Sequence, residues 1–190
     1  MSIYRFVIRF NQPDPRSAGY LADALALGFD DLQRLECQDL YFIEGQLSQE
    51  ECRQLALKLL SDPVTQTVES SMLNVESQNR LSSQPSTVIE VALRPGVTDP
   101  VAEQIVRAAH ELGFEGVQRA ATGLRFLLNW EAEKPDNSVS GFPVERLAKQ
   151  LLANNVIQHW TIGEITPSFP EEAQASGEVE ILPILELSNN

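Results

Sequence analysis

The chain has 190 residues, of which 43% are hydrophobic, a composition typical of a folded globular protein rather than a disordered or fibrous one. Its net charge of -13 disfavours nucleic acid and anionic membranes as partners, because both require clustered Lys and Arg. Arg5 and Arg9 interrupt the apolar N-terminal stretch, which is therefore unlike a signal peptide, and no apolar run is long enough to span a bilayer. Cys37 and Cys52 are too few for a disulfide framework, so the sequence predicts a cytoplasmic protein.

The first predicted elements are a strand and a helix. Residues 4–10 place apolar side chains at every second position, which predicts a half-buried strand. Asp14-Pro15 predicts a helix start, because the carboxylate can cap free amides and proline fits the first turn. Gly28 predicts its end. The apolar stripe of this helix consists of Ala18, Leu21, Ala22 and Leu25.

Two short strands and a second helix are expected next. The strands, over residues 32–37 and 40–44, are predicted to form a hairpin. Ser48 and Glu51 have the spacing of a capping box, which predicts a helix start. A last strand over residues 65–73 completes the order βαββαβ. The apolar stripe of the second helix consists of Cys52, Leu55, Ala56 and Leu59.

The second half of the chain repeats the first. A shift of 85 superposes three dipeptides, namely Asp14-Pro15 on Asp99-Pro100, Gly28-Phe29 on Gly113-Phe114 and Gln33-Arg34 on Gln118-Arg119. A shift of 84 places Leu40 on Leu124 and Phe42 on Phe126, and a shift of 92 places Leu55-Ala56 on Leu147-Ala148. Strands are predicted over residues 89–93, 117–121, 124–130 and 157–165. The matching helix stripe consists of Val144, Leu147, Ala148 and Leu151.

The expected fold class is therefore α+β, with two tandem ferredoxin-like (βαββαβ) units that form an internal pseudo-dimer. The units are expected over residues 1–73 and 87–166, separated by a polar linker at 74–86 and followed by an acidic tail at 167–190. The uncovered faces of the two sheets could stack on each other, or the two sheets could join edge to edge.

Three stretches of the second unit also carry a family resemblance. They are Arg94-Pro95-Gly96-Val97-Thr98-Asp99-Pro100, Gly113-Phe114 with Val117-Gln118, and Leu151-Leu152-Ala153-Asn154-Asn155-Val156-Ile157. Together they resemble the PurS component of phosphoribosylformylglycinamidine synthase. The resemblance covers residues 87 to 166 and reaches residues 3 to 73 mainly through the repeat. The paired units are similar to the N-terminal domain of the fused large form of that synthase.

The resemblance implies a non-catalytic scaffold in de novo purine biosynthesis. Such a scaffold bridges a PurL-type synthetase, separate or fused C-terminally, and a PurQ-type glutaminase, and supports ammonia transfer between them. The assembled complex is a carbon-nitrogen ligase that uses ATP, Mg and glutamine, whereas the chain itself is expected to bind no cofactor or metal. The loops at residues 11–13 and 61–63 differ from their counterparts, so any family contact there is in doubt.

Two loops supply the candidate partner-binding residues, which are Arg94, Pro95, Gly96, Asn154 and Asn155. A rigid proline beside a permissive glycine can expose backbone amides next to a positive charge, although a plain turn accounts for the same residues. The asparagine pair either ends a helix or contacts a partner. No phosphate loop, nucleophile elbow or paired-histidine metal motif is present, and His110, His159, Cys37 and Cys52 are expected to have ordinary structural roles.

Two alternatives to the scaffold remain open. Paired ferredoxin-like units could form a regulatory module that binds a small metabolite at the pseudo-dimer interface. A free-standing enzyme is the weakest interpretation, because no catalytic constellation is evident. The tail contains an apolar run at residues 181–187, which could dock as an added strand or could lead into a fused synthetase.

Overall fold

The structure, a computed structural model of the chain, describes residues 1–72, 87–131 and 142–169. The predicted linker, the loop after Glu131 and most of the predicted tail lie outside these residues. The first half contains β1 (Ser2–Phe10), α1 (Pro15–Ala26), β2 (Leu32–Gly45), α2 (Gln49–Leu55), the π-helical turn η1 (Ala56–Leu60) and β3 (Gln66–Met72). The second half contains β4 (Thr87–Leu93), α3 (Pro100–Glu111), β5 (Val117–Trp130), α4 (Phe142–Leu147), η2 (Ala148–Leu152) and β6 (Gln158–Ile162).

The predicted helix boundaries are confirmed. The Asp14 carboxylate accepts a hydrogen bond from Arg16 N at 2.8 Å, and the Asp99 carboxylate accepts one from Ala102 N at 3.0 Å. Ser48 and Glu51 form the reciprocal bonds of a capping box. Gly28 and Gly113 follow the two long helices with φ of 83° and 87°, backbone angles that favour glycine.

The predicted hairpins are wrong, because the two middle strands of each unit are continuous. β2 and β5 are single strands of 14 residues each. They pair with each other along their whole length, from Leu32↔Trp130 to Gly45↔Val117. This antiparallel pairing satisfies the backbone of both strands along their length, so neither strand has to turn back to find a partner.

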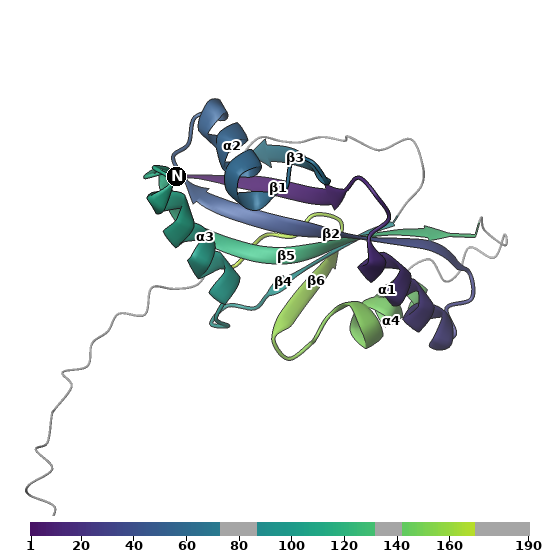
Figure 1. The fold of residues 1–190 in the computed structure, drawn as a ribbon. Helices are drawn as coiled ribbons and strands as arrows, with labels where there is room; N and C mark the ends of the chain where they lie inside the picture. Colours follow the sequence, from purple (N-terminus) through teal and green to yellow (C-terminus); the bar gives the residue numbers. More distant parts are fainter. Residues whose placement is uncertain (73–86, 132–141, 170–190) are drawn as a thin grey trace, which may run out of the picture.

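The six strands form one sheet in the order β3-β1-β2-β5-β4-β6 (Figure 1). The order reads the same from both edges once each strand is replaced by its repeat, so the α+β class and the two related units are confirmed. All neighbouring strands are antiparallel. The units therefore extend their sheets into one rather than stacking two sheets face to face.

A pseudo-twofold axis passes through the β2–β5 pair. Register shifts mark a bulge at Gln33 in β2 and at Gln118 in β5, two positions that the repeat relates by a shift of 85. The same shift relates Asp39 to Leu124, which face each other directly. The shift of 84 is therefore wrong within the sheet, and Leu40 is buried on the face opposite to the one on which Leu124 packs.

Each helix-covered core contains helices from both units. One core combines α2 and η1 of the first unit with α3 of the second, and includes Phe6, Leu55, Ile105 and Ala109. The other combines α1 of the first unit with α4 and η2 of the second, and includes Ala24, Phe126, Leu147 and Leu152. The two helix groups lie toward opposite ends of the long strands (Figure 1). Neither unit completes a core alone.

The helix stripes follow the prediction in two helices and depart from it in α1. The stripe of α2 and η1 and the stripe of α4 and η2 face the cores as predicted. In α1, however, Ala18 and Ala22 are exposed and Leu25 is 42% exposed, while Ala24 is buried. The ring of Tyr20 packs edge-on against Phe126 at 5.0 Å, so contact with the second unit sets the buried face of α1.

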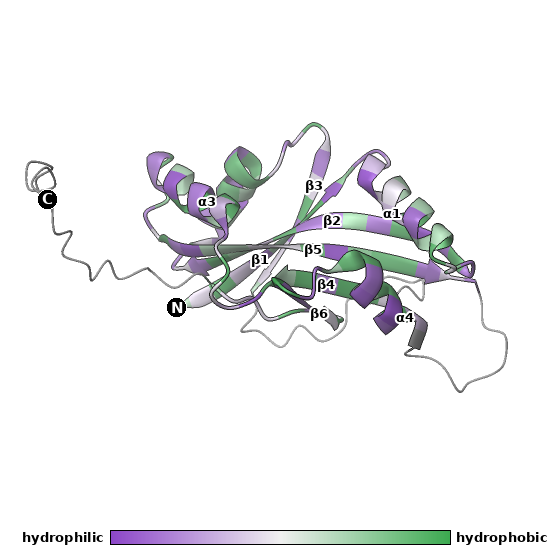
Figure 2. Ribbon diagram, turned by 90° about the horizontal axis from the view of Figure 1, so that it is seen from below, coloured by the Kyte–Doolittle hydropathy of each residue, from purple (hydrophilic) through white to green (hydrophobic). Residues whose placement is uncertain are grey.

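The opposite face of the sheet is covered by the segment that follows β6. Gly163, with φ of 96°, ends the strand earlier than predicted and turns the chain back over the sheet. Ile165 is buried there together with Val7, Leu40, Phe42, Ala92 and Ala121. Figure 2 shows hydrophobic residues along most of β4, whereas hydrophilic and hydrophobic residues alternate along α3. Within the described ranges, no helix is long and apolar enough to cross a membrane.

Candidate functional site

The structure brings together the two loops that contain the predicted partner-binding residues. Arg94 N donates a hydrogen bond to Ile157 O at 2.9 Å, so residues 94–98 and 154–157 lie side by side. We call these two segments turn pair 2. The loop that begins at Arg94 connects β4 to α3, and the other segment connects η2 to β6.

Turn pair 2 exposes the Arg94-Pro95-Gly96 corner. Val97 N donates to Arg94 O at 3.2 Å, and Gly96 has φ of 80°, which closes a tight turn. Arg94, Pro95 and Gly96 are exposed. Among the residues that the structure describes, the Arg94 guanidinium forms no ion pair or hydrogen bond. Its cationic group is therefore available to an external anion.

The asparagine pair holds the second half of turn pair 2. Asn154 Oδ1 accepts from Val156 N at 3.0 Å, and Gln158 Oε1 accepts from Asn154 N at 2.7 Å. Asn155 Nδ2 donates to Lys149 O at 2.9 Å, a carbonyl of the preceding helical turn. Both asparagines thus end the helix and shape the turn, and a partner contact by either one stays a prediction.

Sequence reasoning missed the residue that this turn presents. Val156 is 83% exposed, and its neighbour Ile157 is 41% exposed. The residue types gave no signal for this exposure, because valine and isoleucine are among the residues most often buried. Turn pair 2 therefore combines a free guanidinium with two exposed apolar side chains.

The first unit contains a turn of the same construction. Asp62 Oδ1 accepts from Val64 N at 2.9 Å, and Gln66 Oε1 accepts from Asp62 N at 2.8 Å. Asn11 N donates to Thr65 O at 2.8 Å, which joins residues 11–13 to residues 62–65. We call these segments turn pair 1. Val64 is 82% exposed, so the differing sequence has kept the same shape.

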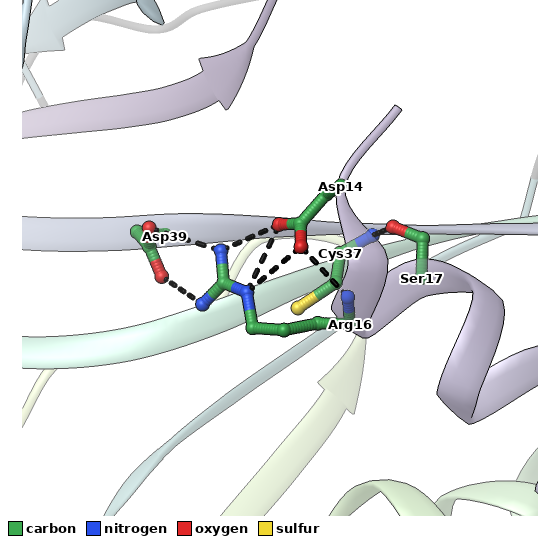
Figure 3. A network of polar contacts seen from close by, with 5 residues as sticks. All are labelled: Asp14, Arg16, Ser17, Cys37 and Asp39. Atoms are coloured by element: carbon green, nitrogen blue, oxygen red, sulfur yellow. Dashed lines mark hydrogen bonds and ion pairs between the residues drawn. The ribbon is translucent and has the colours of Figure 1, made fainter. Parts of the chain in front are cut away.

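A polar network lies beside the pseudo-twofold axis (Figure 3). Arg16 Nη2 donates to the Asp14 carboxylate at 2.7 Å, and Arg16 Nη1 donates to the Asp39 carboxylate at 2.7 Å. These bonds, to Asp39 first and then to Asp14, raise the pKa of Arg16. Burial acts to raise the pKa of Asp14, but the hydrogen bonds from Arg16 outweigh it, so this pKa is lowered. The network holds α1 against β2, and its charged groups are paired with one another.

The two thiols are unsuited to nucleophilic chemistry. Burial raises the pKa of Cys37 to about 12 and the pKa of Cys52 to about 11. Cys37 N donates to Ser17 Oγ at 2.9 Å, so this residue helps to hold strand and helix together. Both cysteines are free and buried. At neutral pH both remain protonated, which fits the structural roles predicted for them.

A buried charge cluster joins the units on the opposite face of the sheet. Arg5 of β1 forms an ion pair with Glu90 of β4, and these side chains are only 4% and 0% exposed. Arg125 Nη1 lies 3.7 Å from the same carboxylate, and Ile165 N donates to it at 2.8 Å. Burial raises the pKa of Glu90, against the opposing effect of Arg5. Sequence reasoning missed this cluster.

One of the two histidines has a structural contact. The ring of His110 contacts Val117 O at 2.6 Å, which links α3 to the start of β5. No group of three or more His, Cys, Asp or Glu side chains could hold a metal ion within the described part of the chain. Two clefts, of about 690 and 540 Å³, are lined by residues of the first unit.

Comparisons with known proteins agree on one family. A family model described as "PurS: Phosphoribosylformylglycinamidine (FGAM) synthase" matches residues 86–165. The PurS subunit of this synthase from Synechocystis sp. is 33% identical over 85 residues, which are 42% of this chain and 83% of that protein. The Mycobacterium leprae subunit is 36% identical over 75 residues, which are 40% and 89% of the two chains. The Archaeoglobus fulgidus subunit is 31% identical over 74 residues, or 39% and 90%.

Proposed function

Since this chain belongs to the PurS family, we propose that it is the non-catalytic scaffold of FGAM synthase in de novo purine biosynthesis. It works in the cytoplasm and bridges a PurL-type synthetase, separate or fused C-terminally, and a PurQ-type glutaminase. By holding the two together it supports the passage of ammonia from one to the other. ATP, Mg and glutamine are used by the assembled complex, in the sites of those partners.

We also propose that the first unit is a second PurS-like unit. The family match falls on the second unit alone, yet α3 and α4 of that unit pack into cores that the first unit completes. This dependence is the observation that carries the proposal, because it gives the first unit the place of a partner subunit. The chain then divides into units at residues 1–73 and 87–166, a linker at 74–86 and a tail at 167–190.

The proposed contacts with the partners lie in the second unit. Arg94, Pro95, Gly96, Asn154 and Asn155 all belong to turn pair 2, and all five are exposed. A scaffold needs such exposed surfaces rather than a closed reaction site.

Size-exclusion chromatography tests the proposal. The chain is mixed with PurL and PurQ from the same source in the presence of ADP and glutamine. We expect the three proteins to co-elute, and omission of this chain to abolish the complex. Failure to join either partner, with both shown to be active, would overturn the scaffold role. A saturable thermal shift with a small metabolite alone would then favour the regulatory module.

A further inference from the structure

We infer that turn pair 2 is a one-sided docking surface for an acidic protein partner, in which Arg94 meets a carboxylate while Val156 and Ile157 enter an adjoining apolar socket. Turn pair 1, although it has the same shape, does not bind this partner. The inference rests on the proposed scaffold role and names the chemistry of the contact.

The surface is rigid before any partner arrives. The backbone bond between Arg94 and Ile157 ties the two segments together, and the Asn154 side chain fixes the backbone at Val156. Exposed apolar side chains on a fixed backbone lose little conformational freedom on binding. Val156 is also more exposed than almost any other large apolar residue of the described ranges, matched only by its counterpart Val64. Such a side chain can leave water only by contacting another molecule.

Charge selects the class of partner. Arg94 is the only charged residue in residues 94–98 and 154–157, within a chain of net charge -13. A free guanidinium can donate two parallel hydrogen bonds to a carboxylate, which gives direction as well as attraction. A phosphate of nucleic acid or lipid could accept the same bonds, but the net charge of -13 on the chain disfavours binding to a polyanion. An acidic patch on a protein, with an apolar pocket beside it, fits both features.

Turn pair 1 lacks the charge and the free polar group. Its only charged residue is Asp62, which occupies the position of Asn154 and would repel the same carboxylate. Asn11 occupies the position of Arg94, and its side chain is already bonded to Thr67 Oγ1 at 2.5 Å. Three residues separate Phe10 from Asp14, whereas five separate Leu93 from Asp99, so this corner also projects less. Both turn pairs expose a valine, but turn pair 1 has a negative charge, whereas turn pair 2 has a positive one.

The repeat supplies matched variants for a test. Val156→Asp and Arg94→Asp place a negative charge in turn pair 2, and Val64→Asp and Asn11→Asp do the same in turn pair 1. Binding of each variant to the PurL and PurQ proteins is measured by titration calorimetry or interferometry. We expect the turn pair 2 variants to weaken binding at least about tenfold, as at an interface hot spot. The turn pair 1 variants should change it less than about twofold, in line with energetically neutral positions outside the contact.

Further measurements distinguish the loss of a charge contact from a loss of folding. Arg94→Lys should retain most of the binding, and raising the salt concentration should weaken the wild-type complex more than the Arg94→Asp complex. Urea midpoints should stay equal across the set, because all four positions are exposed. Equal weakening by Val64→Asp and Val156→Asp, or no weakening by either, would overturn the docking surface while the scaffold role stands. A wild-type chain that joins neither partner would overturn both.

Discussion

The two units are alike in the second helix of each unit and differ on the face of the sheet opposite the helices. Leu55 and Leu147 occupy equivalent places in the two cores, and both are fully buried. On the opposite face, however, Glu90 pairs with Arg125 of β5, where the first unit has Val7 beside Leu40 of β2. Helix packing therefore preserves the symmetry of the fold, whereas the polar positions are free to take on roles that only one unit needs.

The two units also depend on each other for their stability. The helices that cover each end of the sheet come from both halves of the chain, so burial is shared rather than duplicated. The ion pair of Arg5 with Glu90 crosses from one unit to the other in the same way. A chain built like this should unfold as one cooperative body, which distinguishes it from two domains on a string.

The largest effect is expected at the buried ion pair between Arg5 and Glu90. Arg5→Met leaves the Glu90 carboxylate almost fully buried, with Arg125 at 3.7 Å as its nearest cation. Breaking a buried pair from one side typically costs about 3–5 kcal/mol, because the remaining charge is uncompensated. We expect a loss of this size in the free energy of unfolding, measured by urea denaturation.

A second substitution identifies the cause of that loss. Adding Glu90→Gln to Arg5→Met should recover part of the stability, because the amide is neutral and its oxygen can still accept the bond from Ile165 N. If the double variant is less stable than Arg5→Met alone, the uncompensated charge is not the reason for the loss.

The next effect compares the two cores directly. Leu55→Ala and Leu147→Ala each remove a fully buried side chain, and such truncations cost about 2–5 kcal/mol through lost burial and the cavity left behind. Because the two positions are equivalent, we expect similar losses, each in a single urea transition followed by circular dichroism and by tryptophan fluorescence. Two separate transitions in either variant would mean that the units unfold independently.

Local sequence signals predicted most elements of this fold. Asp14, Ser48 and Asp99 start helices through contacts within one turn, and Gly28 and Gly113 end them through their own backbone angles. Such features depend on neighbours in the sequence, so a pattern can predict them. The apolar stripes of the second helix in each unit were predicted for the same reason.

Features that depend on the other unit could not be predicted in this way. The polar pair Gln38-Asp39 interrupts an apolar stretch and resembles a turn, yet both residues are paired with β5 of the second unit, opposite Arg125 and Leu124. The buried face of α1 depends on Phe126 in the second unit. At the candidate site, residue types indicated each loop separately, but only the structure joins Arg94 to Ile157 and exposes Val156 between them.

The smallest effect contrasts the two equivalent helix caps. Asp99 is 4% exposed, and besides capping Ala102 N it accepts bonds from Thr122 N and Thr122 Oγ1, both at 2.9 Å. Asp99→Ala should cost about 2 kcal/mol, because a cap is lost and the amide of Thr122 loses its partner. Asp14→Ala should cost only about 1 kcal/mol, since Arg16 keeps its bonds to Asp39.

Urea midpoints of the two alanine variants, with Asp99→Asn and Asp14→Asn as controls, measure this difference. Asparagine can still cap, so Asp14→Asn should stay near the wild type, whereas Asp99→Asn keeps the cap and gives up part of the link to β5. Equal losses at both sites would mean that the Asp99–Thr122 bonds add nothing to stability. A larger loss at Asp99 would extend the comparison of the units from their surfaces to their interiors. The repeated aspartate bonds β5 directly in the second unit, whereas in the first unit Arg16 makes the bond to β2.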